Sequence, residues 1–560
     1  MLHSLLLLAS AFLLLSPTLA AQQPTATPSL RVATVSGAIR LDGRLDEALW
    51  AEADSIGNLT QIEPQQGAAP SGRTVVRVVA TDDALVFGIR ADYPDGARTT
   101  TFARERDANL NNEDHLKLVL DTYRDGRSGY VFAINANGAR YDALVTGQGE
   151  GENSNWDAAW EAATARTETG WSAEIRIPVR SIQFKQGERE WGFNVERRVQ
   201  RLLESDRWAS PERNFKVTQT YRAGRLTEVP EFSLGLGFSV RPSLMAGAGV
   251  PTPKGEVDGT SDASLDITKT LGTNTLAALT FNTDFAETEV DTRRTNLTRF
   301  PLVFPEKRTF FLQGADIFDF GLGTGDDVRP FFSRRIGLLS GIEVPIRAGL
   351  KVSGRGRGSN VGALVLHTGD IEDREALSLP MTSSTMGVLR AKQNVLRESS
   401  VGMIATFGDP LGRADAWTGG ADATYQTSRL MGNKNFRAGV WGLATGREGL
   451  RDGQRSAFGG KLEYPNDLWD VSLAYRKVGD AFEPSLGFVP RPAVQALNLS
   501  MTHKPRPKGN VLGLDVRQMV NELFFTLVSD LDSQWESYRV FFAPVNWRLE
   551  SGDRFELNAN

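Results

Sequence analysis

The residues best suited to bind a ligand lie in a polar stretch of the first half of the chain. Trp156 stands between Asn155 and Asp157, just after a glycine-containing loop, and Trp160 follows at the start of an alternating segment. Sugar rings stack on exposed aromatic faces, while amides and carboxylates hydrogen-bond to the sugar hydroxyls. We therefore expect Trp156, with Asn155 and Asp157, to form a carbohydrate platform and Trp160 to lie in the core. The alternative is that Trp156 also packs in the core.

A second candidate surface surrounds Tyr93 and the loop that begins at Arg104, and both residues belong to the predicted carbohydrate site. The same loop carries Asp107, Asn109 and Asp114. Calcium takes about six to eight oxygen ligands from loops of this kind, so Ca²⁺ is a candidate cofactor there. The spacing is not that of an EF-hand, and a solvated acidic loop is the alternative.

A third polar cluster lies in the second half of the chain. Glu306, Lys307 and Arg308 stand between Phe304 and the pair of phenylalanines at 310–311. One carboxylate and two cations can pair, and the aromatic rings can pack against a wall. The pattern suits a loop folded into a barrel lumen as a constriction or partial plug. A well-packed turn between strands is the alternative.

Signatures of catalysis are missing from the sequence. Beyond residue 20 the histidines are His115, His367 and His503, which are scattered and form no zinc-type pair. A Gly-x-Ser-x-Gly motif is not found. With 68 acidic residues, the sequence neither selects nor excludes the carboxylate pair of a glycosidase. Because the chain has no cysteine, thiolate chemistry and disulfides are excluded.

The amino end predicts export from the cytoplasm. Residues 1–20 have a short apolar core followed by small residues up to Ala20, which is typical of a cleaved signal peptide. Lys and Arg are absent from this end, so an uncleaved anchor is the alternative. Residues 21–30 form a polar leader, and no later run of 18 apolar residues predicts a membrane helix. The net charge of −5 argues against nucleic acid as a partner.

A length of 560 residues predicts two domains. Residues 31–225 contain short β-rich runs bounded by turn residues, which is typical of a β-sandwich. Within it, Asp46 is expected to cap a short helix from which Trp50 anchors to the sandwich, and Trp171 is expected in the core. Residues 226–231 read as a linker containing a proline.

Residues 232–560 alternate between apolar and polar side chains. The run from Phe232 to Val240 places every second residue on one apolar face, and Trp469–Tyr475 repeats the pattern. Strands that cross an outer membrane need about 9–11 residues with this period, so we predict an antiparallel outer-membrane-type β-barrel of about 12–14 strands. A second soluble all-β domain is the alternative. The chain ends within an apparent strand, so we expect the barrel to be incomplete at its carboxyl end.

Several of these segments resemble two known families. The first half is similar to family-9 carbohydrate-binding modules at 41–50, 114–123, 130–138 and 170–178. Segments 282–291, 304–318, 332–337 and 486–491 resemble the uncharacterised barrel family called domain of unknown function 5916, which commonly follows such a module. The first resemblance implies a β-sandwich that binds sugar between aromatic rings, sometimes with structural calcium. The second implies architecture rather than activity, and relatives usually run longer.

Three functions are compatible with this pattern. The favoured one is a carbohydrate-binding protein of the bacterial cell envelope, with a sandwich in the periplasm or at the surface, tethered to an outer-membrane barrel among lipids, serving carbohydrate catabolism. The second is a hydrolase acting on O-glycosyl bonds, although no catalytic domain is left over once sandwich and barrel are assigned. The third is a gated outer-membrane pore or transporter.

Overall fold

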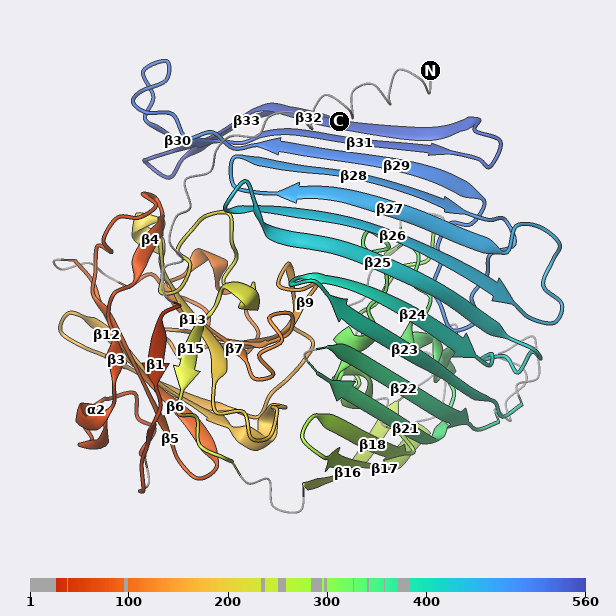
Figure 1. The fold of residues 1–560 in the computed structure, drawn as a ribbon, viewed down its shortest axis with the longest axis horizontal. Helices are drawn as coiled ribbons and strands as arrows, with labels where there is room; N and C mark the ends of the chain where they lie inside the picture. The colour runs from red at the N-terminus through yellow and green to blue at the C-terminus, as the bar shows by residue number, and fades with distance from the viewer. Residues whose placement is uncertain are drawn as a thin grey trace.

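The computed structural model describes residues 27–560 apart from 38, 95–98, 233–236, 250–257, 284–294, 297–299, 326, 340–341, 357 and 371–381. The predicted signal peptide and most of the predicted leader therefore lie outside the described residues. The described chain is almost entirely β structure in two parts, which lie side by side in Figure 1. The predicted fold class, a β-sandwich followed by an antiparallel sheet of the outer-membrane barrel type, is confirmed.

The first part is a sandwich of two sheets. One sheet has the order β1-β15-β13-β7-β8-β9-β10 with β14 and β4 at its side, and the other has the order β11-β12-β6-β5-β2 with β3. The strands of the first sheet are β1 (Ser29–Arg31), β4 (Thr60–Glu63), β7 (His115–Asp121), β8 (Tyr130–Asn135), β9 (Arg140–Thr146), β10 (Gly151–Asn153), β13 (Trp191–Val199), β14 (Glu204–Arg207) and β15 (Gly224–Thr227). Those of the second are β2 (Ala33–Thr34), β3 (Ser55–Ile56), β5 (Thr74–Ala80), β6 (Ala84–Asp92), β11 (Glu161–Arg166) and β12 (Gly170–Pro178).

The sandwich core forms because alternate residues of each strand face the opposite sheet. In β7, Leu116, Leu118 and Leu120 belong to this core, while His115 and Lys117 face the other way. Trp171 is 1% exposed, as the sequence predicts. Every described member of this core comes from a residue between 30 and 232, so the sandwich has its own hydrophobic core.

The predicted anchor Trp50 lies on helix α2 (Leu49–Glu52) and is 2% exposed, which confirms its structural role. Its indole N–H donates to Glu174 at 3.3 Å. Glu174 also accepts the backbone N–H of Gly43 at 2.9 Å. A Cβ on Gly43 would lie 2.4 Å from the Thr164 backbone, so only glycine fits this turn. The predicted cap by Asp46 is wrong, because Ala48 occupies the N-cap position and makes no side-chain bond.

The boundary between the parts lies later than the sequence suggests. β15 ends at Thr227 within the predicted linker, and its parallel partner β1 begins at Ser29 within the predicted leader. Phe232, expected to open the first barrel strand, packs in the sandwich core against Trp191 with ring centroids 6.1 Å apart. The first strand of the second part, β16, starts at Phe238. The sandwich therefore extends to residue 232, because aromatic packing outweighs the local alternation.

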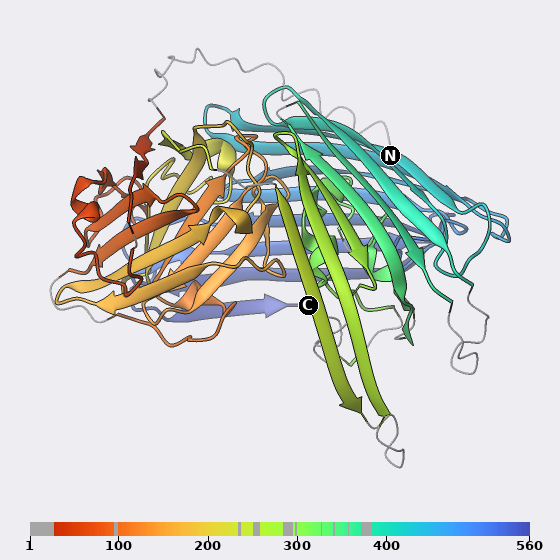
Figure 2. The same cartoon turned by 90° about the horizontal axis from the view of Figure 1, so that it is seen from below.

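The second part is one large antiparallel sheet of 16 strands, more than the predicted 12–14, because many of its turns are short. Its order is β16-β17-β18-β21-β22-β23-β24-β25-β26-β27-β28-β29-β31-β32-β30, with β33 also on β32. Figure 2 shows the sheet curling around a hollow side. Among the described strands no pairing joins β16 to β30 or β33, so the curled sheet is not closed.

The strands of this sheet are β16 (Phe238–Gly249), β17 (Asp258–Leu271), β18 (Thr275–Phe281), β21 (Ile346–Arg355), β22 (Ser359–Thr368), β23 (Thr385–Val395), β24 (Ser399–Phe407), β25 (Trp417–Leu430), β26 (Lys434–Gly446), β27 (Ser456–Pro465), β28 (Trp469–Val478), β29 (Val494–His503), β30 (Val516–Met519), β31 (Asn521–Ser529), β32 (Trp535–Leu549) and β33 (Arg554–Ala559). A small separate pair joins β19 (Leu338–Leu339) to β20 (Ile342–Glu343).

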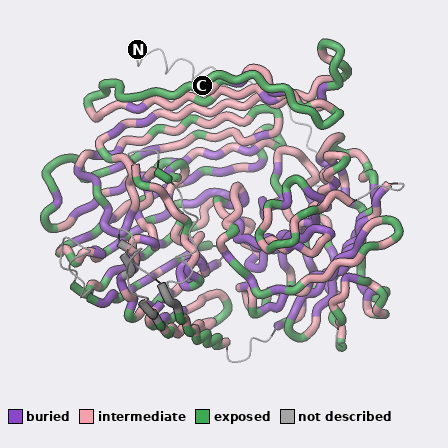
Figure 3. Tube along the Cα trace, turned by 180° about the vertical axis from the view of Figure 1, so that it is seen from behind, coloured by how far each residue is buried: buried purple, intermediate pink, exposed green. Residues whose placement is uncertain are grey.

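Burial alternates along the strands of the large sheet, as Figure 3 shows. The outward residues are apolar: Met403 is 69% exposed and Val440 is 63% exposed. The inward residues include charged and polar side chains such as Arg390 and Lys351, which are almost fully buried. A water-soluble sheet has the opposite polarity, whereas an outer-membrane barrel places its apolar face toward lipid. No helix among the described residues is long and apolar enough to cross a membrane.

A segment between β18 and β21 lies against the inward face of the large sheet. We call residues 304–336 the inner segment; it contains α4 (Thr309–Leu312) and the 3₁₀ turns η5 (Ala315–Phe318) and η6 (Ser333–Arg335). Its polar contacts reach β21, β23 and β28: Gln313 with Lys351, Asp316 with Arg355, Asp319 with Arg390 and Asp327 with Arg476. A Cβ on Gly362 would lie 2.8 Å from the Phe318 ring, so glycine lets the segment approach the wall.

Candidate functional site

Trp156, the predicted sugar platform, lies in the sandwich core. It is 8% exposed, and its ring centroid lies 5.0 Å from that of Tyr130 and 6.3 Å from that of Phe132. The expected exposure is therefore wrong, because two rings from β8 enclose the indole. Trp160 is 2% exposed and donates its indole N–H to Asp142 at 3.0 Å, which confirms its predicted place in the core.

The flanking polar residues do not form a platform with it. Asn155 is half-buried and bonds to Asn153 through its amide at 3.0 Å. Asp157 is exposed and forms an ion pair with Arg106 at 2.9 Å. Arg104 is exposed. Among the described residues, no hydrogen bond holds Asn155, Asp157 or Arg104 over the face of the Trp156 ring.

Tyr93, the alternative aromatic candidate, is also buried. Its hydroxyl donates to Asp114 at 2.7 Å, and the guanidinium of Arg197 lies 5.1 Å from its ring. Burial and the bond to Asp114 raise the pKa of Tyr93 above its usual range. Tyr93 therefore stabilises the sandwich rather than presenting a ring to solvent.

The predicted calcium set is not brought together. Asp114 is 1% exposed and accepts bonds from Tyr93 and from the backbone N–H groups of Thr100 (2.8 Å) and Gln200 (2.6 Å), which satisfy it. Asn109 accepts the backbone N–H of Asn111 at 3.0 Å, as the cap of a 3₁₀ turn. The side-chain oxygens of Asp114 and Asn109 thus already accept hydrogen bonds from protein donors.

Asp107 instead joins a different carboxylate cluster, with Asp142 and Asp157. Arg106 lies among the three, 2.6 Å from Asp142, 2.9 Å from Asp157 and 3.5 Å from Asp107. Burial and the two neighbouring carboxylates raise the pKa of Asp107 to about 6. The guanidinium supplies the positive charge that a metal ion would bring, so the cluster is explained as an ion-pair network.

A polar hollow on the outer face of the first sheet is the better candidate for ligand binding. We call it the sandwich cavity; its volume is about 500 Å³. One cross-strand row runs from Lys117 of β7 through Ala133 of β8 to Tyr141 of β9. The small side chain of Ala133 leaves the space between the two larger ones. The lining also includes Asp107, Asn109, Asn111, His115, Glu150, Glu152, Lys216 and Thr218.

Hydrogen bonds fix the groups of the sandwich cavity. Glu152 accepts the Lys117 ammonium at 3.0 Å and the Tyr141 hydroxyl at 2.9 Å, one on each carboxylate oxygen. The Lys117 ammonium lies 5.9 Å from the Tyr141 ring centroid. Burial lowers the pKa of His115, so its ring is neutral near pH 7. An aromatic ring beside fixed amide, carboxylate and ammonium groups is the chemistry that recognises a sugar.

Sequence reasoning missed Tyr141, Lys117 and Glu152. The alternation of β7 places Lys117 on the face opposite the core residues Leu116 and Leu118. The alternation of β9 does not mark this face, because its polar Asp142 lies on the core side and bonds to Trp160. The strand register then decides which of these side chains lie next to each other, and the sequence of one strand alone does not specify that register.

The charged cluster of the second half lies within the inner segment. Arg308 is 1% exposed; it binds Glu306 at 2.7 Å and donates to the Ile336 carbonyl at 2.9 Å. Its guanidinium lies 4.1 Å from the Phe311 ring. Lys307 is half-buried, and its backbone N–H donates to Glu306 at 3.1 Å. These contacts all lie within the inner segment, which packs against the inward face of the sheet. The constriction or plug interpretation stays a prediction, beside the alternative of a well-packed turn between strands.

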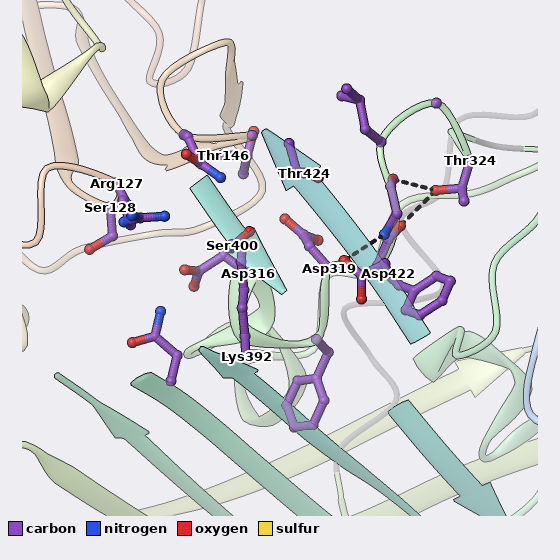
Figure 4. A pocket seen from close by; sticks show the side chains of 18 of the residues that line it. Arg127, Ser128, Thr146, Asp316, Asp319, Thr324, Lys392, Ser400, Asp422 and Thr424 are labelled. Carbon is purple, nitrogen blue, oxygen red and sulfur yellow. Dashed lines mark hydrogen bonds between the residues drawn. The ribbon is translucent and has the colours of Figure 1, made fainter. Parts of the chain in front are cut away.

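A second cavity lies where the sandwich meets the hollow of the large sheet. We call this space of about 450 Å³ the junction chamber. Figure 4 shows side chains from three sources around it: Arg127, Ser128 and Thr146 from the sandwich, Asp316, Asp319 and Thr324 from the inner segment, and Lys392, Ser400, Asp422 and Thr424 from strands of the large sheet. No local pattern of the sequence indicates this chamber, because its three walls are far apart in the chain.

The fold and these two cavities define a two-part β protein, a sandwich with a polar surface hollow docked onto a curled sheet with a polar inner face. Residues 250–345 match the family described as Domain of unknown function (DUF5916), the family that this stretch resembles in sequence. No curated protein matches the chain.

Solved structures similar to this chain include a carbohydrate binding module family 9 (CBM9) from Caldicellulosiruptor kristjanssonii in complex with cellotriose. The match has 14% identity and a TM-score of 0.26, and covers 36% of this chain and 93% of that one. The same module with glucose matches at 14% identity, with a TM-score of 0.26, over 36% and 95%. The outer membrane protein OprD from Pseudomonas aeruginosa matches at 8% identity, with a TM-score of 0.29, over 82% and 90%.

Proposed function

We propose that this chain is a carbohydrate-binding protein of the bacterial cell envelope, in which the sandwich recognises a glycan and the large sheet holds it in the outer membrane for carbohydrate catabolism. The observation that carries the proposal is the sandwich cavity, which Tyr141 lines together with Lys117 and Glu152. A cavity of about 500 Å³ is of the size that small ligands occupy.

Binding of glucose and cellotriose to the full-length protein in detergent tests the proposal, with isothermal titration calorimetry as the readout. We expect Tyr141→Ala to weaken binding at least tenfold and Tyr141→Phe to weaken it less, because the ring remains. Phe102→Ala is the matched control, since Phe102 is an exposed aromatic outside the cavity. Equal affinity in Tyr141→Ala and the wild type would reject this site.

The membrane anchor is supported by the inverted polarity of the large sheet. Apolar side chains such as Met403 and Val440 point outward, while Arg390 and Lys351 are buried on the inner side. The protein is expected to fractionate with outer membranes and to migrate differently on a gel before and after heating. Recovery as a detergent-free monomer would contradict the anchor.

Turn lengths support an orientation for the sandwich. At the end of the sheet that contacts the sandwich, turns 272–274, 396–398, 431–433 and 466–468 are three residues long. At the other end, connections such as 408–416, 447–455 and 479–493 are longer. Outer-membrane barrels have short periplasmic turns and longer extracellular loops. We therefore infer that the sandwich faces the periplasm.

Cysteine labelling in whole cells tests this orientation, because the chain has no cysteine of its own. Asp452→Cys lies in a long connection and Met431→Cys in a short turn, and both parent residues are exposed. A maleimide too large to cross the outer membrane is expected to label Asp452→Cys on intact cells. It is expected to label Met431→Cys only after the membrane is permeabilised. The reverse pattern would place the sandwich outside.

A further inference from the structure

The junction chamber contains polar side chains with hydrogen-bonding capacity that the described residues leave unused. Arg127 is 9% exposed; one terminal guanidinium nitrogen donates to the Arg397 carbonyl at 3.2 Å, and the other has no hydrogen-bond partner among the described residues. Gln148 is also 9% exposed, and its amide oxygen likewise has no hydrogen-bond partner among the described residues. Burying a polar group without a hydrogen bond destabilises the fold, so both side chains are suited to bind a polar molecule.

Two further groups of the chamber carry charges without a close ion pair. The inner wall contributes Lys392, and the inner segment contributes Asp319 (Figure 4). No ion pair within 4.0 Å is found for either side chain among the described residues. The other acidic groups of these two walls are already paired, Asp316 with Arg355 and Asp422 with Arg390. Arg127 and Lys392 are therefore the cationic donors, and Asp319 the carboxylate acceptor, that we consider for a ligand; the Asp125 carboxylate, which also lines the chamber, accepts from the backbone N–H of Arg127 and from the Ser128 hydroxyl.

The polarity of the wall changes along the strands in a way that shapes the chamber. Toward the far end of the sheet, inward residues such as Leu366 and Leu443 pack in the apolar core beneath the inner segment. Toward the sandwich, inward residues of the same strands are Asn360 and Arg437, which line the chamber. Continued apolar packing would have filled this space, so the polar residues keep it open and wet.

We propose that the junction chamber is a second binding site, which takes a small hydroxylated carboxylate such as a hexuronic acid. The ligand carboxylate would accept from Arg127 and Lys392, since guanidinium and ammonium groups form the strong bonds to carboxylates. Its hydroxyl groups would donate hydrogen bonds to the Asp319 carboxylate and to the Gln148 amide oxygen. An anion without hydroxyl groups has no hydrogen to donate to these two acceptors. A volume of about 450 Å³ holds a molecule of one or two sugar rings.

Such a ligand would touch the sandwich, the inner segment and the sheet at once. Its binding would hold the sandwich against the mouth of the hollow, where Arg127 also contacts the turn at 397. The proposal goes beyond glycan recognition by the sandwich cavity, because the two sites share no lining residue.

Three probes with one ring and different charge test the proposal on the full-length protein in detergent. Glucuronate carries a carboxylate, glucose a hydroxymethyl group and glucosamine an ammonium. Calorimetry in the Tyr141→Ala background isolates the chamber from the sandwich cavity. We expect glucuronate to bind at least tenfold more tightly than glucose or glucosamine.

Variants of the chamber and a matched lysine complete the test. Lys392→Met and Arg127→Gln are each expected to weaken glucuronate binding at least tenfold. Lys461→Met is the control, because Lys461 lies on the same sheet outside the chamber and pairs with Glu463 at 3.0 Å. Heat-modifiable migration on a gel checks that each variant folds. Glucuronate affinity that is undetectable, equal to that of glucose, or unchanged in folded Lys392→Met would overturn the proposal.

Discussion

Replacing Trp156 with alanine is expected to destabilise the sandwich, because the ring is a core element. A tryptophan buries about 200 Å² on folding, which at about 25 cal/mol per Å² corresponds to about 5 kcal/mol of transfer free energy. Trp156 is 8% exposed, so nearly all of that applies, and the alanine methyl retains a small share. The contacts with Tyr130 and Phe132 are lost as well. We expect the free energy of unfolding to fall by about 3–5 kcal/mol.

Urea unfolding of the isolated sandwich, residues 27–232, followed by far-ultraviolet circular dichroism, measures this loss. Trp50→Ala is the positive control, because Trp50 is 2% exposed, and a similar loss is expected there. Phe102→Ala is the negative control, since its ring is 64% exposed, and a change below about 0.5 kcal/mol is expected.

The result that would refute this reasoning is specific. If Trp156→Ala unfolds within about 0.5 kcal/mol of the wild type and loses sugar binding, the ring is an exposed platform after all. If Trp156→Ala is destabilised as strongly as Trp50→Ala and Tyr141→Ala alone loses sugar binding, the sandwich cavity is supported.

Three further outcomes are expected. Burial and the neighbouring Glu204 carboxylate raise the pKa of Asp206 above its unfolded value of about 4, so the free energy of unfolding is expected to fall as pH rises above that value, by up to about 1.4 kcal/mol per pH unit. Asp206→Asn is expected to flatten that decline in urea unfolding at pH 5 to 8, and an unchanged slope would contradict the assignment. Asn214 contacts two turns of the large sheet. Asn214→Leu is therefore expected to speed protease cleavage between the two parts. Cleavage at the wild-type rate would show that these contacts do not hold the parts together. An isolated sandwich of residues 27–232 is expected to melt cooperatively. A fragment of residues 27–225 is expected to melt at a clearly lower temperature, because three core side chains follow residue 225. Equal melting temperatures would support a domain boundary at residue 225.

The sequence by itself determined the class of each part. Period-two alternation needs only local information, since successive side chains of a strand point to opposite faces. It therefore predicted the β-sandwich, the outward apolar face of the large sheet, and the core positions of Trp160 and Trp171. For the charges around Glu306 it left two interpretations open, a segment in the lumen and a well-packed turn between strands.

Only the tertiary structure decided where the sites lie. Trp156 precedes its strand, so no alternation governs it, and two rings of β8 bury it. Phe232 continues an alternating run, yet aromatic partners in the sandwich hold it there. The junction chamber joins Arg127, Asp319 and Lys392, which are separated by long stretches of chain. Such sites arise from strand register and from docking of the two parts, and these are set by packing over the whole molecule rather than by any local pattern.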